Sequence, residues 1–455
     1  MSVALGVGVF ALVVLGGKVT SYDAGMAVPD WPGTFGRQMF LAPIEDWAYD
    51  PATGEFFQGP FFEHSHRLLG AAAGLLSIAQ VVAVWRARPV RPVLRWASVA
   101  LLGLIISQGL MGGFRVSEQS VFLAGVHGVA GQLILGFAVV LAGATALPQR
   151  LRDRAASVKP KGGAAEIWAL TAMLLVAFVA AVLLGRQDGE AELIQWRFSA
   201  VGAVCVGAMT LWLAWSATRL AHNLRAARAA SNNRTGRKPA AWAYALLGAV
   251  SLQLVLGAAV RHGQAERAIP DAPLVMGSVL PPTTPEGRAE ALATMDAKLV
   301  ARAQTQPELS KIWLHYAHRV GAIGVCVVVL AAAAAVGRSA AMDRRTRRWA
   351  GLALAFVGVQ LALGLMTVWS NIHPLLASGH QAVGAALLAT VCALAWSVHR
   401  ARLVALEAES EQPIATVPAA RTAVTTPEPA PRADSWPPAP AGTRSDPRVL
   451  EEVGA

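Results

Sequence analysis

The chain has 455 residues, of which 55% are hydrophobic and 15% are charged, and its formal net charge is +11. A soluble globular domain has about a quarter charged residues, so this composition excludes an ordinary soluble protein. The basic residues are concentrated in alternate loops between apolar segments, as in membrane proteins that mark one side of the bilayer with Lys and Arg. This distribution argues against a nucleic-acid-binding surface.

Apolar segments of about 20 residues, the length that crosses a bilayer as a helix, follow one another along the chain. We predict an all-α polytopic membrane protein with about ten spans. Their ranges are 2–17, 66–84, 97–114, 124–147, 166–184, 199–219, 241–260, 314–336, 350–370 and 378–398. The first run lacks a basic segment before it, so we expect it to stay as a helix. The basic loops follow every second span, which predicts a multi-pass protein of the cell (inner) membrane with both termini in the cytoplasm.

An internal repeat divides the chain into two similar halves. The equivalent positions are Gly16 and Gly257, Asp30 and Asp271, His66-Arg67 and His318-Arg319, Gln108 and Gln360, Gly112 and Gly364, His127 and His380, and Gly131 and Gly384. Each half is predicted to form a four-helix bundle, over 1–147 and 241–404. Both halves start from the same side of the membrane, so the repeats are parallel and give an eight-helix core.

Two further segments complete the predicted organisation. Residues 148–240 are expected to add a transmembrane hairpin with basic cytoplasmic loops, and its two spans contain no histidine. Residues 405–455 are rich in Pro, Ala, Thr and charged residues, a composition that buries too little apolar surface to fold. We predict that this tail is disordered and cytoplasmic.

Four histidines occupy matching places in the two halves, near the outer ends of predicted spans: His66 and His127 in the first, His318 and His380 in the second. Titratable side chains inside membrane segments are costly and therefore indicate function. Neutral imidazole is the usual axial ligand of haem iron, and two imidazoles facing each other across a bundle suit a b-type haem. We therefore predict two haem-iron sites, one in each half.

The segment 63–67, Glu-His-Ser-His-Arg, is the richest cluster of polar residues. Glu63 lies one turn before His66 on the same side of a helix, so its carboxylate could reach a ligand bound there. An ordinary interfacial cluster at a helix start is the alternative. Position 315, equivalent to Glu63, is a histidine. This asymmetry suggests that the first half serves chemistry and the second holds a cofactor.

Arg67 and Arg319, which follow the first histidine of each pair, are candidates to bind haem propionates, because a guanidinium recognises carboxylates bidentately. The remaining histidines are assigned no haem. His64 is expected off the ligand face, at the surface or in proton exchange, and His262 and His373 are expected in outer loops. His222 and His399 lie at the cytoplasmic boundary, and His315 is left without a role.

These residues resemble the haem A synthase family. The Glu-x-x-His-Arg motif at 63–67, the second His-Arg at 318–319, the later histidines His127 and His380, and the Pro-Asp-Trp segment at 29–31 all match its pattern. The resemblance covers most of residues 1–147 and 241–400.

The resemblance implies that the second half keeps one haem b between His318 and His380, whereas the first receives haem O between His66 and His127. The implied oxidoreductase reaction converts the porphyrin C8 methyl to a formyl group in two steps, through an alcohol and a geminal diol that loses water. Its product, haem A, serves terminal oxidases. Glu63 would assist at the substrate, by handling protons or stabilising positive charge, or would merely orient ligands or propionates.

The implied partners are haem O as substrate, haem O synthase, cytochrome oxidase assembly and membrane lipid. The chain departs from the family at three places. It lacks the cysteine pair that some members carry in the first outer loop, the hairpin and tail lie outside the core pattern, and Lys18 stands where arginine is expected.

Two other functions share part of this pattern. A di-haem b-type electron carrier, such as a quinol oxidoreductase with Glu63 as a proton relay, would have the same spans and histidines but would keep both haems permanently. A transporter built from parallel repeats, with histidines in a proton pathway, would bind no haem.

Overall fold

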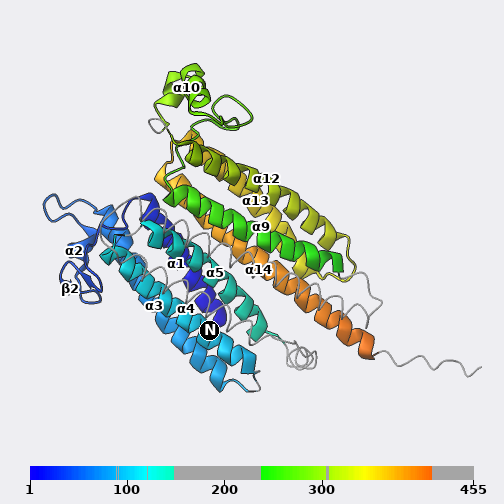
Figure 1. The fold of residues 1–455 in the computed structure, drawn as a ribbon. Helices are drawn as coiled ribbons and strands as arrows, with labels where there is room; N and C mark the ends of the chain where they lie inside the picture. The colour runs from blue at the N-terminus through cyan, green and yellow to red at the C-terminus, as the bar shows by residue number, and fades with distance from the viewer. Residues whose placement is uncertain (89, 91, 120, 148–236, 304–306, 412–455) are drawn as a thin grey trace, which may run out of the picture. The chain divides into compact units, whose positions relative to one another are not determined.

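The computed structural model describes residues 1–88, 90, 92–119, 121–147, 237–303 and 307–411. In this part of the chain, eight helices are long and apolar enough to cross a membrane (Figure 1). They are α1 (Ser2–Ser21), α3 (Gln58–Arg86), α4 (Pro92–Ser117), α5 (Val121–Thr145), α9 (Arg237–His262), α12 (Leu309–Gly337), α13 (Arg344–Trp369) and α14 (Pro374–Glu411). The prediction of an all-α polytopic membrane protein is confirmed. The predicted spans 166–184 and 199–219 lie outside the described residues.

Several helices extend beyond the predicted spans. α3 begins at Gln58 and α12 at Leu309, so His66 and His318 lie inside their helices and not at the first residue. α3 tolerates Pro60 because a first-turn N–H has no intrahelical partner to lose. α14 continues to Glu411, past the predicted start of the tail at 405. Residues 405–411 are mostly Ala, Leu and Glu, which are strong helix formers; the rest of the predicted tail lies outside the described residues.

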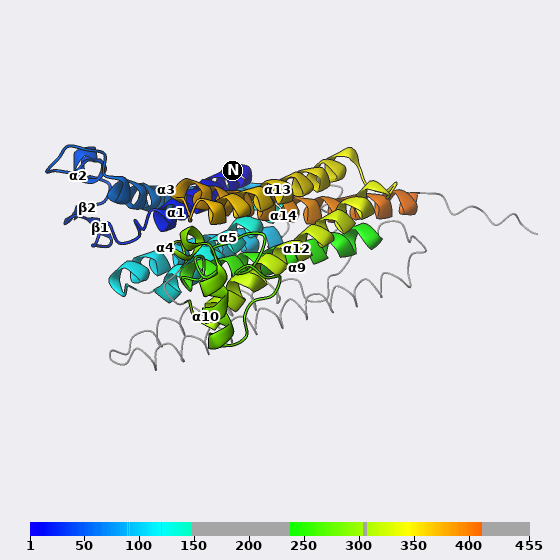
Figure 2. The same cartoon turned by 90° about the horizontal axis from the view of Figure 1, so that it is seen from above.

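The long helices form two groups (Figure 1), which Figure 2 shows from above, and the buried side chains give each group an apolar core. In the first group, α1, α3, α4 and α5 bury side chains such as Leu5, Leu101 and Leu135. In the second, α9, α12, α13 and α14 bury Leu246, Val329 and others against one another. Lipid tails are as apolar as leucine, so close packing of these side chains, and not their removal from water, holds each group together.

The two groups contact each other along α1, α5, α9 and α14. The Gln381 side chain of α14 donates to the carbonyl of Val13 in α1 at 3.2 Å and fills the space above Gly17. Cys392 of α14 lies against Gly136 of α5, where an added Cβ would stand 3.0 Å from the sulfur. Small residues permit this close approach of helices, as at other interfaces between membrane helices.

Each half builds the same turn after its first helix. The carboxylate of Asp30 accepts two backbone N–H groups at 2.7 and 3.0 Å, and that of Asp271 accepts two at 2.8 Å each. Gly36 and Gly277 end these turns with φ values of 76° and 80°, a left-handed conformation that costs glycine nothing. The internal repeat found in the sequence is therefore also a repeat of backbone geometry.

Short elements complete the loops that follow α1 and α9. The first loop contains an antiparallel pair, β1 (Gly33–Thr34) and β2 (Arg37–Gln38), and the helix α2 (Ile44–Ala48). The second contains α10 (Pro285–Thr294) and α11 (Ala297–Val300). Arg261 of α9 donates to the carbonyl of Thr20 in α1 at 2.7 Å, so the two loops start side by side. We call this end of the helices the loop end.

Asp343 fixes the start of α13 at the opposite end. Its carboxylate accepts the backbone N–H of Thr346 at 2.8 Å and the Thr346 hydroxyl at 2.7 Å, as an N-cap residue does, and it also pairs with Arg400. Burial opposes ionisation, but these hydrogen bonds and the Arg400 charge hold the pKa of the carboxyl below its usual range. The cap ties α13 to α14.

Candidate functional site

The first histidine pair lies near the loop end of the first helix group. His66 of α3 and His127 of α5 face each other with ring centroids 6.2 Å apart and ring planes at 74°. A Cβ on Gly16 of α1 would stand 3.1 Å from Cε1 of His66, and one on Gly112 of α4 would stand 3.3 Å from Cε1 of His127. All four helices of the group therefore shape the pair.

The second pair repeats this arrangement. His318 of α12 and His380 of α14 have ring centroids 6.5 Å apart and ring planes at 76°. A Cβ on Gly257 would approach His318 to 3.1 Å, and one on Gly364 would approach His380 to 3.3 Å. The glycines at equivalent positions of the repeat thus leave the same space beside equivalent rings.

Both pairs fit the axial ligands of a haem iron. A metal–imidazole bond of about 2 Å on each side places the two ring centroids roughly 6 Å apart, close to both observed separations. Within the described residues, Nδ1 of His66, His127 and His380 is buried without a hydrogen-bond partner. A buried nitrogen without a partner is costly, and a hydrogen bond or metal ion normally satisfies it. The residues present therefore suit the two haems that the sequence predicts.

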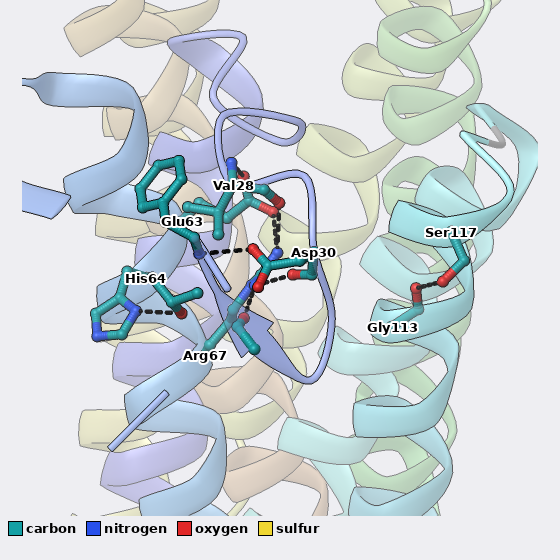
Figure 3. Close-up of polar contacts among 10 residues, drawn as sticks. Val28, Asp30, Glu63, His64, Arg67, Gly113 and Ser117 are labelled. Carbon is teal, nitrogen blue, oxygen red and sulfur yellow. Dashed lines mark hydrogen bonds and ion pairs between the residues drawn. The ribbon is translucent and has the colours of Figure 1, made fainter. Parts of the chain in front are cut away.

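Glu63 is held beside the first pair by a network of charged hydrogen bonds (Figure 3). Its carboxylate accepts the backbone N–H of Val28 at 2.8 Å and the guanidinium of Arg67 at 2.9 Å. The two side chains are only 5% and 8% exposed. Removing one partner from such a buried pair typically costs about 3–5 kcal/mol, because the other charge is left uncompensated. Glu63 is thus held in a fixed position and is not a mobile group.

Arg67 also binds the first loop. Its guanidinium donates to the carbonyls of Asp30 at 2.6 Å, Gly33 at 2.8 Å and Val28 at 2.8 Å. Together with the bond to Glu63, four of its five N–H groups are therefore used within the protein. The sequence analysis took Arg67 as a propionate ligand; that stays a prediction, with one N–H left for it.

Arg319 has the corresponding role in the second half. It donates to the carbonyl of Leu274 at 2.9 Å and to that of Ile269 at 3.2 Å, the positions equivalent to Gly33 and Val28. Its acidic partner on the helix is missing, because His315 takes the place of Glu63 and is itself buried. A carboxylate at this position of the helix therefore occurs in the first half alone.

The sequence analysis expected His64 either at the surface or in proton exchange. The structure shows that His64 does not lie at the surface. It is 1% exposed, Nδ1 lies 2.9 Å from the hydroxyl of Thr34, and the ring packs on Trp47 with centroids 4.3 Å apart. α3 starts earlier than predicted, so this part of the helix is covered by the first loop. His64 secures that loop to α3.

His262 was predicted in an outer loop, but it is the last residue of α9 and packs against the first helix group. Its ring atoms lie 3.4 and 3.5 Å from the position of a Cβ on Gly125 of α5, less than one turn from His127. A residue of the second half thus borders the first histidine pair. The sequence gave no sign of this, because the repeat aligns positions and says nothing of contacts between the halves.

Two other neighbours of the histidines were missed. Gln253 of α9 places its amide nitrogen 3.0 Å from Nδ1 of His318 and 2.8 Å from the His318 carbonyl. Arg115, in the last turn of α4, lies close enough to Glu63, His66 and His127 to interact with their charges. Arg115 directly follows the predicted span 97–114, where an arginine at the membrane boundary is ordinary, so nothing in the sequence singled it out.

The chain matches a known protein family over most of its length. A family model described as "Cytochrome oxidase assembly protein" (COX15-CtaA) matches residues 1–187 and 200–392. The match includes the predicted span 166–184 and nearly all of 199–219, which the sequence analysis placed outside the family's core pattern.

Three relatives carry the name "Heme A synthase". Those of Caulobacter sp. (strain K31) and Caulobacter vibrioides are each 25% identical to this chain, over 86% of it and 93% of the relative. That of Beijerinckia indica is 25% identical over 43% of this chain and 61% of the relative. The family model spans most of the chain and both histidine pairs. The chain therefore belongs to the COX15-CtaA family of cytochrome oxidase assembly proteins, among which its relatives are named for haem A synthesis.

Proposed function

We propose that this protein is a haem A synthase, an oxidoreductase that converts the C8 methyl of haem O to a formyl group in two successive steps. The observation that carries the proposal is the asymmetry of two otherwise matching histidine pairs. Both pairs have the spacing of axial ligands, but a buried carboxylate, Glu63, stands beside the first alone. A pure electron carrier has no need of this difference.

The two halves have different roles in this proposal. His66 and His127 bind the substrate, haem O, whereas His318 and His380 hold a resident haem b. A haem with two imidazole ligands supplies one-electron transfer when bound. Glu63 provides a fixed negative charge near the substrate, where it can stabilise positive charge that develops during oxidation or accept a proton. Val28 and Arg67 hold the carboxylate in place.

The proposal also includes the setting of the enzyme. The protein spans the cell inner membrane with both termini in the cytoplasm, and the histidine pairs lie toward the outer face. It receives haem O from haem O synthase within the membrane and supplies haem A for cytochrome oxidase assembly. The family description and the relatives' names support this place in haem biosynthesis.

Pigment analysis tests the function directly. The chain is purified from cells that also make haem O synthase, and its haems are extracted and separated by mass. Haem B together with haem O, haem A or the hydroxylated intermediate is the expected result. Haem B alone, at two per chain, would favour a di-haem electron carrier, and a preparation without haem would contradict both functions.

A second asymmetry supports the assignment of the halves. The residue equivalent to Gln253 in the first half is Leu12, so His318 has an amide beside Nδ1 whereas His66 has none. A hydrogen bond at the second ring nitrogen orients a ligating histidine. The amide nitrogen lies beside both Nδ1 and the His318 carbonyl and so holds the ring in one orientation. Of the four histidines, His318 alone has its Nδ1 held by a side chain of the described residues, which supports the second half as the one that retains its haem.

We expect Gln253→Leu to weaken the hold on the resident haem by about 10- to 100-fold. The measurement is the rate at which the purified protein loses haem b to excess apomyoglobin, together with the reduction potential of the haem that remains. Gln381→Leu is the matched control, because that amide binds Val13 and not a histidine. Equal haem loss in both variants would show that Gln253 acts only through packing.

A further inference from the structure

Arg115 is a cation near the loop end whose guanidinium binds nothing in the described part of the chain. It comes from the last turn of α4 and lies against Gly25, leaving no room for a Cβ there. Arg67, Arg261 and Arg319 at the same end all donate hydrogen bonds to carbonyls or carboxylates. A guanidinium has five N–H donors, and a partly buried cation without an acceptor is costly. The Arg115 guanidinium therefore lacks an acceptor for its N–H groups.

The residues around Arg115 indicate that its missing acceptor belongs at the first histidine pair. Arg115 follows Gly112 by one turn of α4, and a Cβ on Gly112 would stand 3.3 Å from Cε1 of His127. Arg115 is also close enough to Glu63, His66 and His262 to interact with their charges. The carboxylate of Glu63 is already occupied by Val28 and Arg67 and does not bind Arg115. The remaining neighbours are imidazoles, which do not neutralise a cation. An anionic group on a ligand that binds between His66 and His127 would neutralise it.

The described part of the second half has no cation at the equivalent position. The position equivalent to Arg115 is Thr367, whose hydroxyl donates to the carbonyl of Leu363 in its own helix at 2.7 Å. The position equivalent to Gly25 is Glu266, which pairs with Arg261 at 2.8 Å. The first half thus presents a positive charge where the second is neutral or internally paired. This difference, like Glu63, separates the two sites.

We propose that Arg115 binds a propionate carboxylate of the porphyrin held by His66 and His127, and that His262 of the second half lines the same side of that site. The inference rests on the proposed function, because it assigns the substrate's carboxylate to a residue of the substrate site. Arginine forms short, charge-assisted bonds to carboxylates, often in pairs. Arg67, by contrast, holds the loop that covers this site.

Titration of the full-length protein, purified with its resident haem, tests the inference. Ferric haem B and its dimethyl ester, which lacks both negative charges, are added separately, and binding at the first pair is followed by the change in the haem absorption band. Wild type should prefer the free acid. Arg115→Thr, which introduces the residue of the second half, should lose roughly 10- to 100-fold in affinity for haem B and little for the ester.

Two further variants make the test selective. Arg115→Lys keeps the charge and should recover part of the preference for the free acid, whereas Arg338→Thr removes an exposed charge after α12 and should leave binding at wild-type strength. If Arg115→Thr weakened haem B and its ester equally, Arg115 would serve the fold alone. Unchanged binding of both would instead assign it to another anion, such as a lipid phosphate.

Failure of the inference and of the proposed function give different results. A wild-type protein that takes up no added haem at the first pair would overturn both. A wild-type protein that converts haem O, with an Arg115→Thr variant that still prefers the free acid, would overturn the inference alone.

Discussion

Replacing His318 by alanine is expected to remove the resident haem completely, from about one haem b per chain to none. His318 and His380 are the two ligands that the second half offers, and a single imidazole on one face leaves the iron with half of its protein ligands. The measurement is haem b per chain, from the reduced absorption spectrum of the purified variant.

His66→Ala is the matched control for this prediction. It makes the same change at the equivalent position of the first half, beside Gly16 in place of Gly257. We expect it to keep haem b at the level of wild type and to lose the bound haem O. If His318→Ala kept its b-type spectrum whereas His66→Ala lost it, the two halves would have to exchange roles.

The second large effect is expected at Glu63. Glu63→Gln should reduce the formation of haem A by at least about 100-fold, the size of effect typical of a positioned acid–base or charged group in an active site. Haem O and haem b should remain bound. The measurement is the ratio of haem A to haem O extracted from cells that express the variant with haem O synthase.

Glutamine is preferred to alanine here because Glu63 also supports the structure. Its carboxylate neutralises Arg67 and accepts the N–H of Val28, and glutamine retains one acceptor oxygen for them. Haem b bound by the second half reports whether the variant has folded. Normal haem A output with haem b in place would remove Glu63 from the mechanism, and loss of haem b would show that the ion pair serves mainly the fold.

The sequence predicted the features that depend on the length of the apolar segments and on the internal repeat. Apolar length located the eight described spans, because a helix must satisfy its own backbone groups inside a bilayer. The repeat matched Asp30 with Asp271, and the structure shows the same two-bond turn at both. The four histidines were identified because titratable groups are costly inside a membrane, and the structure brings them together as the predicted pairs.

The features that the sequence did not predict depend on where a side chain points after the loops have folded. Arg67 was expected to face a porphyrin, but the carbonyls of Val28, Asp30 and Gly33 in the first loop lie within its reach and take most of its donors. His64 is buried for the same reason, since the loop that carries Thr34 and Trp47 covers it. The place of His262 depends on contact between the two halves, and aligning one half with the other gives no information about such contacts.

The bond from Gln381 to Val13 also bears on how a duplicated gene came to encode one indivisible protein. The counterpart of Gln381 in the first half is Gly128, and the counterpart of Gly17, over which its side chain lies, is Ala258. A dimer of either half with itself would therefore lack the donor or the space that this bond needs. The two copies thus differ at their shared surface, and the bond between Gln381 and Val13 can form only between a first half and a second half.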